Sequence, residues 1–360
     1  MRAHSGLRWV ALLPLAWLAA CDPPAPTASE PPLPRPAAAA VESADAELAV
    51  ADRAFRNARS EVLAALHQQM APLQAALERL LAQPDAAQLA AARAAWEDSY
   101  RAYNQAWPLL ATQAQLEPEL EAVLQQTDRW PLLPGYVDYV PGWPESGIIY
   151  DVSLTMDRRT LLAQQNITDA TEVSVGFQVV QLLLFGLADS PRQPQDFRAV
   201  TESLPSHQGP VSERPENRRR SYLTVVSRIL LDDLRELTRP VLQEEESAHH
   251  VGALVRALGR TSVRLARAGS LDAAADLFSG HYLAAESRAL IEHSHQQTLA
   301  FWLDRDSEAS QALWAVLEQT APVFAAQLSK QWQQAPQDYA ALGALLMRPP
   351  GRASALSRNG

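Results

Sequence analysis

The spacing of apolar residues predicts that most of this chain is helical. Pro72 interrupts the first apolar stripe, so we expect a kink or break there. Further stripes cover residues 89–107, 223–237, 251–267, 272–303 and 308–330. Alternating strand patterns are scarce, so the pattern favours an all-α fold built of packed helical bundles. The first stripe recurs at the three-, four- and seven-residue intervals of one helix face, and its members are Phe55, Val62, Leu66, Met70, Leu73, Leu77 and Leu80.

Three segments depart from this amphipathic pattern. Residues 172–186 are apolar on nearly every face, which is typical of a central helix, and Gly176 and Gly186 permit close packing and a C-terminal stop. Residues 190–218 are rich in proline and predict a long connection. Residues 128–155 predict a long irregular loop, because they mix prolines and glycines with Trp130, Tyr136, Tyr139, Trp143 and Tyr150.

The predicted central helix contains two glutamines that need hydrogen-bond partners. Gln178 and Gln181 are the only polar side chains between Phe177 and Gly186, and a spacing of three places both on one helix face. A buried amide without a partner costs roughly 1–3 kcal/mol. Two interpretations follow. The amides bond to each other, to loop backbone or to a neighbouring helix, or they line a ligand cleft.

The N-terminus predicts export and lipid attachment. Arg2 and Arg8 precede an apolar run from Trp9 to Leu18, which is the arrangement of a secretory signal and is shorter than the roughly 20 residues of a membrane span. Leu18-Ala-Ala-Cys21 is similar to the bacterial lipobox, so we expect a signal peptide over residues 1–20 and lipid on Cys21. Acyl chains would then hold the chain on the periplasmic side of a bacterial membrane. The alternative is an ordinary signal peptide with a chance cysteine.

Composition predicts the remaining organisation. Residues 21–45 are rich in proline and alanine, which predicts a disordered tether. We expect an N-terminal helical bundle over residues 46–160, a C-terminal bundle over 161–345 and a disordered tail over 346–360. The net charge of −10 argues against nucleic acid as a partner. Cys21 is the only cysteine, so no disulfide forms within the chain.

Several motifs resemble those of the imelysin family. Residues 176–186, GFQVVQLLLFG, are similar to its central pattern, Gly-x-His-x-x-Glu followed by apolar residues. Residues 94–103, 129–131, 136–140, 146–149, 218–223 and 232–234 resemble further family segments in the same order, and residues 292–299 are loosely similar to a late one. The resemblance implies two packed helical bundles with a Trp/Pro loop between the early and central helices. It also implies a periplasmic or outer-surface protein of a family first classed as metallopeptidases and associated with iron or other metal uptake.

The sequence departs from the family at the two motif positions that carry chemistry. Gln178 stands where the family has histidine, and Gln181 stands where it has glutamate. Neutral amides offer only weak carbonyl oxygens to a metal ion, and they cannot act as a general base. We therefore expect no metal at this motif, no catalytic residue and no cofactor.

These observations predict a ligand-binding or accessory protein. Gln178 and Gln181 would contact the ligand, Trp130 and Tyr139 would form walls, and Glu97 and Tyr100 would lie nearby. A neutral or polyhydroxylated group, or a preformed metal complex, suits these amides better than a bare ion. For Glu97, a solvated helix face is the alternative.

Three other interpretations stay open. One is a metallopeptidase-like protein that keeps its metal through other residues, and another is a structural partner of a membrane protein. The third is a di-metal site, because Glu246/His249 and Glu292/His295 have the Glu-x-x-His spacing of di-iron bundles. That site would also need two bridging glutamates.

Overall fold

A computed structural model describes residues 38–115, 117–140, 142–202, 209–239, 247–271 and 285–348. The described residues from Ser43 onward belong to one compact unit. Cys21, Glu246 and residues 349–360 lie outside the described residues. The predicted lipid anchor therefore stays a prediction, as do the tail and the division into bundles at residue 160.

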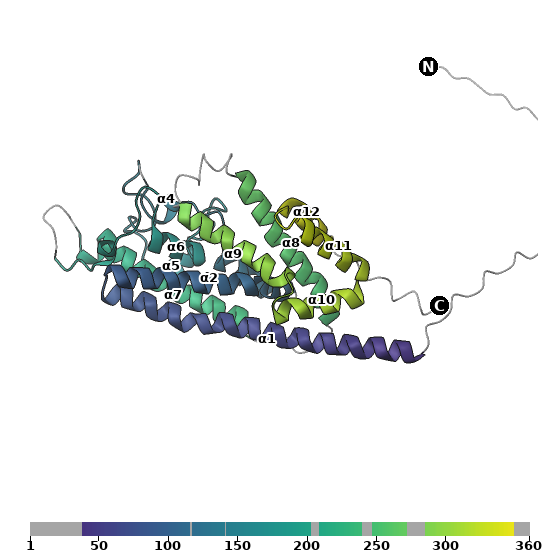
Figure 1. Cartoon of the computed structure of the whole chain (residues 1–360). Coiled ribbons are helices and arrows are strands. Elements are labelled where there is room, and N and C mark those ends of the chain that lie inside the picture. Colours follow the sequence, from purple (N-terminus) through teal and green to yellow (C-terminus); the bar gives the residue numbers. More distant parts are fainter. Residues whose placement is uncertain are drawn as a thin grey trace, which may run out of the picture. The chain divides into compact units, whose positions relative to one another are not determined.

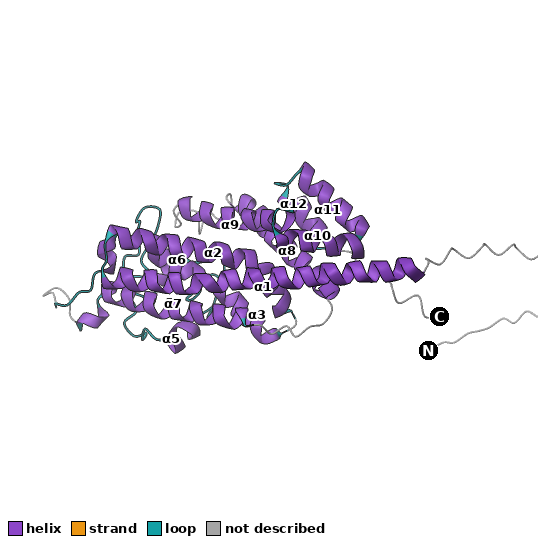
Figure 2. Ribbon diagram, turned by 60° about the horizontal axis from the view of Figure 1, so that its bottom comes forward, coloured by secondary structure: helices purple, strands orange, loops and turns teal. Residues whose placement is uncertain are grey.

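Three long helices run alongside one another in both views (Figures 1 and 2). They are α1 (Ala38–Ala82), α2 (Ala86–Ala114) and α7 (Pro215–Thr238). The break expected at Pro72 does not occur, since α1 continues through this residue. Helix α1 also includes residues 38–45, which the sequence assigned to the tether. The predicted 190–218 connection ends early because α7 begins at Pro215, a residue suited to the first turn of a helix.

Helix α2 is the element against which most of the central helices pack. It contacts α3 (Pro118–Thr127), α6 (Phe177–Phe185), α8 (Ser247–Leu271) and α9 (Ala285–Leu303). All but one residue of α6 are buried, which confirms its central position. It is shorter than the predicted 172–186 segment, because Gly176 has a φ of 95° and cannot be part of the helix. Residues 172–176 are instead extended or bent.

The predicted helix over residues 308–330 is two helices. Helix α10 (Glu308–Thr320) ends before Ala321, and α11 (Pro322–Gln334) begins at Pro322. Proline lacks the backbone N–H that a continuing helix needs. The helix therefore breaks at Pro322 even though the apolar stripe continues across it. Helix α12 (Tyr339–Leu346) follows and packs against α8. In Figure 1, α10, α11 and α12 form the yellow-green group.

The remaining elements are short. They are α4 (Pro134–Val137), α5 (Arg158–Ala163) and the 3₁₀ helices η1 (Pro194–Phe197) and η2 (Val211–Glu213). The described residues contain no strand, only the isolated bridges Val140–Trp143 and Gly186–Pro191. The predicted all-α fold is confirmed, and so is a largely irregular 128–155 segment. Within the described part of the chain, no helix combines the length and apolarity needed to cross a bilayer.

Gly176 fixes how closely α6 approaches the end of α3. A Cβ atom there would lie 2.4 Å from the carbonyl oxygen of Gln126 and 2.6 Å from that of Thr127. The positive φ adds a second penalty for any other residue. Glycine therefore allows the backbones of the α6 N-terminus and the α3 C-terminus to touch.

We predict that Gly176→Ala lowers the free energy of unfolding by about 3 kcal/mol or more, because backbone atoms would have to move apart. Urea denaturation followed by circular dichroism measures the change. Gly252→Ala in α8 is the matched control, because its Cβ would come no closer than 3.8 Å, to the Arg256 side chain. That variant should gain about 0.5–1 kcal/mol from helix propensity. Equal effects at the two positions would contradict the close approach.

Candidate functional site

An aromatic face of α2 holds the N-terminus of α6. Trp96, Tyr100 and Tyr103 follow one another at intervals of four and three residues and are all buried. The Trp96 and Tyr100 rings are stacked, with centroids 4.9 Å apart and an angle of 14° between their planes. Phe177 packs against both tyrosines, and the Trp96 indole Nε1 donates a hydrogen bond to its carbonyl oxygen (3.1 Å). This contact places the next residue, Gln178, beside Tyr100.

A buried carboxylate lies at the centre of the polar groups that meet here. Asp128 follows the last residue of α3, and its side chain is 2% exposed. It accepts a hydrogen bond from Gln178 Nε2 (2.6 Å), and it forms an ion pair with Arg264 of α8 (3.0 Å). The Tyr100 hydroxyl lies 3.4 Å from Asp128 Oδ2 and 3.3 Å from Gln178 Nε2. We call the group the Asp128 cluster; it comprises Tyr100, Tyr103, Asp128, Gln178, Arg264 and His295.

Several polar atoms of the Asp128 cluster are buried and have no hydrogen-bond partner among the described residues. They are Gln178 Oε1, Tyr103 Oη, Arg264 Nη2 and His295 Nε2. Buried polar atoms in native proteins are nearly always satisfied by protein, ordered water or ligand. This concentration of unused donors and acceptors is the feature that marks the Asp128 cluster as a candidate binding site.

The surroundings of the cluster shift the pKa values of His295, Tyr100 and Arg264 away from neutrality. Burial lowers the pKa of His295 to about 3, and the positive charge of Arg264 adds to this shift, so the imidazole is neutral at physiological pH. Burial raises the pKa of Tyr100, and the Asp128 carboxylate raises it further. Burial works against the charge of Arg264, but the Asp128 carboxylate outweighs it and raises the guanidinium pKa. The cluster thus contains one matched pair of opposite charges.

The predicted site residues on α2 and α6 are only partly brought together. Gln178 and Tyr100 are in contact, as expected for a shared site. Both glutamines are buried, with exposed fractions of 1% for Gln178 and 0% for Gln181. Glu97 is half-buried on α2, and burial raises its pKa. No described contact links Glu97 to Gln178, and the predicted ligand-contact roles stay predictions.

Tyr139 belongs to a different polar cluster. Its hydroxyl lies 2.5 Å from Ser190 Oγ, and the Arg192 guanidinium lies over its ring. The neighbouring Asp138 carboxylate pairs with Arg192 and with Arg219 of α7, and all three side chains are buried. Tyr139 therefore helps to fix the irregular 128–155 loop.

Trp130 is partly buried and packs against the core, and its peptide bond to Pro131 is cis. No described hydrogen bond or ring contact joins it to the Asp128 cluster. Its role as a wall of the site stays a prediction.

Sequence reasoning missed Asp128, Tyr103 and Arg264 as members of the site. Asp128 directly precedes residues 129–131, which resemble a family segment, and Arg264 lies between Val263 and Leu265 in a stretch that also contains Arg256 and Arg260. The position of Asp128 beside this segment was a usable signal, whereas the charge of Arg264 does not distinguish it from the neighbouring arginines. Tyr103 could be assigned only to the apolar stripe of its helix.

The donor set of the Asp128 cluster does not fit a bare metal ion. The nitrogen of Gln178, rather than its oxygen, faces Asp128, and the guanidinium of Arg264 already neutralises that carboxylate. A cation placed here would be repelled by Arg264 at short range. Among the described residues, no three His, Cys, Asp or Glu side chains are grouped as a metal site requires.

A second buried carboxyl is bonded to a residue near the C-terminal end of α3. Asp233 of α7 is 2% exposed and accepts a hydrogen bond from Gln126 Nε2 (2.8 Å). Burial raises its pKa from 3.8 to about 7, although the Gln126 hydrogen bond acts in the opposite direction. This carboxyl therefore changes its charge near neutral pH.

Comparison with known proteins identifies one family. The sequence model of the imelysin family, Peptidase_M75, matches residues 59–355. No curated protein matches the chain.

The raised pKa of Asp233 predicts a specific pH dependence. Between about pH 4 and pH 7 the unfolded chain loses this proton while the folded chain keeps it, so the stability contribution falls as pH rises, by about 1.4 kcal/mol per unit. Asp233→Asn removes the titration. We expect this variant to be more stable than the wild type by about 2–4 kcal/mol at pH 8, with little difference at pH 4.

Urea denaturation at pH 4, 6 and 8 measures this difference. Asp232→Asn is the matched control, because Asp232 is 53% exposed and forms only surface ion pairs with Arg158 and Arg235. Its effect should stay within about 1 kcal/mol at every pH. A pH-independent difference for Asp233→Asn would show that Asp233 has an ordinary pKa.

Proposed function

This chain belongs to the imelysin family, and we propose that it is a non-enzymatic, lipid-anchored binding protein with an accessory role in metal uptake. The proposed ligand presents neutral hydroxyl or amide groups to the Asp128 cluster. Those groups belong either to a free small molecule or to a preformed metal complex. The observation that carries the proposal is the Gln178–Asp128–Arg264 network, which leaves unused hydrogen-bonding atoms but no free charge.

The charges of the Asp128 cluster favour a neutral group. Asp128 and Arg264 are paired at 3.0 Å, so a cationic ligand would meet the guanidinium and an anionic ligand would meet the carboxylate. A neutral hydroxyl or amide avoids both costs. Gln178 Oε1, Tyr103 Oη and His295 Nε2 have no hydrogen-bond partner among the described residues. A hydroxyl or amide group of the ligand can act as that partner, because it both donates and accepts hydrogen bonds.

The chemistry of the same residues argues against an enzyme. General acid–base catalysis is most efficient when the pKa of the group lies near the working pH. The pKa of His295 is lowered to about 3, and the amides of Gln178 and Gln181 do not accept protons in water. The cluster is therefore suited to recognition by hydrogen bonds.

Two variants separate binding from folding. Gln178→Leu removes a donor to the buried Asp128 carboxylate, so we expect a loss of about 1–3 kcal/mol in stability together with loss of ligand binding. Tyr103→Phe removes only a hydroxyl without a partner among the described residues. That variant should be as stable as the wild type or about 1 kcal/mol more stable, and it should still bind ligand more weakly.

Calorimetric titration with the neutral ferric tris-acetohydroxamate complex, free acetohydroxamic acid and glycerol distinguishes the two sources of ligand groups, with thermal melting as the control for folding. Binding that is unchanged in Tyr103→Phe would contradict the proposed contact. If none of these probes binds and Tyr103→Phe is simply more stable, the cluster is part of the packed core and the proposal fails.

A second prediction concerns the family metal site. Gln178→His together with Gln181→Glu restores the family motif, but Arg264 would still repel a cation beside it. We expect this double variant to bind Zn²⁺ at least about tenfold more weakly than a triple variant that also carries Arg264→Gln.

Elemental analysis and zinc titration measure the difference, and Arg264→Gln alone is the control. Tight stoichiometric metal in the wild type that Gln178→Leu abolishes would overturn the proposal. Equal zinc affinity of the double and triple variants would remove the role assigned to Arg264.

A further inference from the structure

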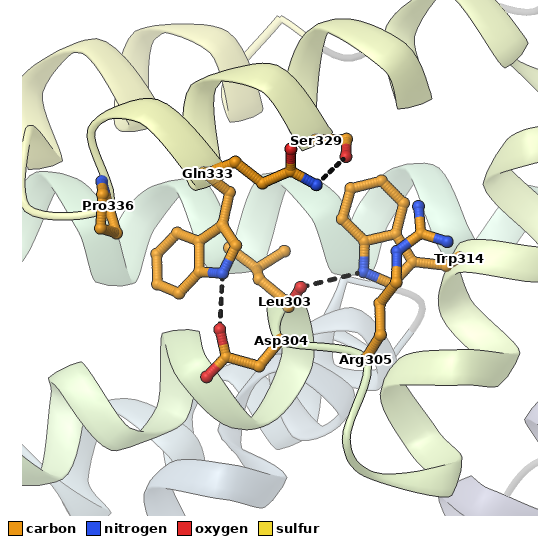
Figure 3. Close-up of a pocket in the computed structure, with 8 residues that line it drawn as sticks. Leu303, Asp304, Arg305, Trp314, Ser329, Gln333 and Pro336 are labelled. Atoms are coloured by element: carbon orange, nitrogen blue, oxygen red, sulfur yellow. Dashed lines mark hydrogen bonds between the residues drawn. The ribbon is translucent and has the colours of Figure 1, made fainter.

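A separate cavity lies where the end of α9 meets α10 and α11, as Figure 3 shows. Its volume is about 290 Å³, near the lower end of the roughly 300–1,000 Å³ range of small-molecule pockets. Its lining comes from Leu303 and the turn after α9, Trp314 of α10, Trp332 with its neighbours on α11, and Pro336 just after α11. None of its lining residues belongs to the Asp128 cluster.

Two fixed indole rings line this cavity. Trp332 Nε1 donates to Asp304 Oδ1 (2.6 Å), and Trp314 Nε1 donates to the carbonyl oxygen of Leu303 (3.2 Å). Both polar atoms of the indoles are therefore satisfied, and the rings offer only their apolar surfaces to the cavity. Rigid aromatic walls bind a ligand with little loss of side-chain entropy.

The rim of the cavity combines hydrogen-bond acceptors with donors. Asp304 Oδ2 and Gln333 Oε1 accept no hydrogen bond from other described residues. Ser329 Oγ accepts from Gln333 Nε2 (3.2 Å), which leaves its own proton free to donate. The Arg305 guanidinium donates to Glu318 (2.7 Å) through Nη2 and keeps further N–H groups. Groups that both donate and accept, such as hydroxyls, fit this arrangement.

The charges at the rim exclude ligands of either sign. The Arg305 guanidinium lies 4.1 Å above the Trp314 ring, so the face that would attract an organic cation already holds one. An anion would meet the carboxylate of Asp304 in the lining, and the Arg305 guanidinium is already paired with Glu318. A neutral ligand avoids both penalties.

The backbone at Arg305 supports a role for its side chain. Its φ is 64°, in the left-handed region that favours glycine over arginine. Hydrogen bonds from Arg305 N to Ser310 Oγ (2.9 Å) and from Gln311 Nε2 to the Arg305 carbonyl oxygen (3.0 Å) hold the turn. Unfavourable backbone conformations of this kind concentrate at functional sites. Here the conformation places a guanidinium on an indole at the cavity.

We propose that this cavity is a binding site for a neutral polyhydroxylated ring, as in a sugar. The apolar face of the ring packs against the indoles of Trp314 and Trp332. Its hydroxyl groups bond to Asp304, Arg305 and Gln333 at the rim. The proposal does not depend on the function proposed for the Asp128 cluster, because the two sites share no residue.

The test is saturation-transfer NMR on the full chain, kept in a detergent without sugar groups. The probes are glucose and N-acetylglucosamine, with choline as the cation and acetate as the anion. We expect both sugars to bind, and choline and acetate to give no signal. Binding of choline in place of the sugars, or of none of the four probes, overturns the proposal.

Variants locate the binding. Asp304→Asn still offers an oxygen to the Trp332 indole, and Arg305→Gly removes the guanidinium at a position where glycine adopts the backbone without penalty. Each should weaken sugar binding roughly tenfold while the melting temperature stays close to that of the wild type. Trp143→Phe is the matched control, because Trp143 is 69% exposed and lies in the 128–155 loop. Sugar binding unaffected by Asp304→Asn and Arg305→Gly would place the ligand elsewhere and refute the site.

Discussion

The irregular 128–155 loop depends on the carboxylate of Asp138, which two buried guanidiniums share. Asp138 pairs with Arg192 and with Arg219, and removing it would leave two buried positive charges without their counter-ion. The preceding residue of α7, Arg218, donates to the carbonyl oxygens of Ile148, Ile149, Asp151 and Leu154. A loop of this length has few helical hydrogen bonds of its own. Arg218 therefore supplies donors for its backbone carbonyl groups, and Arg192 and Arg219 supply the counter-charges for Asp138.

The same helix connects this loop to the Asp128 cluster. Tyr222 of α7 lies one turn after Arg218 and donates to the carbonyl oxygen of Ser174 (2.8 Å), just before α6 begins. Asp128 lies between the end of α3 and the start of the loop, where Gly176 brings the α6 backbone into contact with Gln126 and Thr127. The position of Gln178 relative to Asp128 is therefore set by close backbone packing. Little freedom remains for these side chains to rearrange.

The sequence predicted the positions of the helices better than it predicted which side chains contact one another. The stripes at 89–107 and 223–237 correspond to α2 and α7, because an amphipathic helix shows its period locally. The boundaries at Pro215 and Pro322, and the start of α6 after Gly176, were missed. Pro322 and Gly176 lie within continuous apolar stripes that hide the breaks, and Pro215 is one of several prolines that together resemble a connection.

The composition of the Asp128 cluster was outside the reach of pattern reasoning. Gln178 was identified because a polar residue in an apolar helix requires a partner, and it contacts Tyr100 as expected. The partners of Gln178 and Asp128 come from α2 and α8, and Arg264 is 136 residues from Asp128 in sequence. The periodic spacing of apolar residues within one helix carries no information about a pair so far apart in the sequence. For the same reason Trp332 and Asp304 could not be paired in advance.

The ion pair between Asp128 and Arg264 has a thermodynamic consequence for the whole domain. When a metal ion neutralises a buried acid, the stability of the fold rises and falls with the free concentration of that ion. The guanidinium of Arg264 is covalently part of the polypeptide, so every folded molecule has it at the site. The counter-charge of Asp128 is therefore present whatever the free concentration of metal ions around the protein.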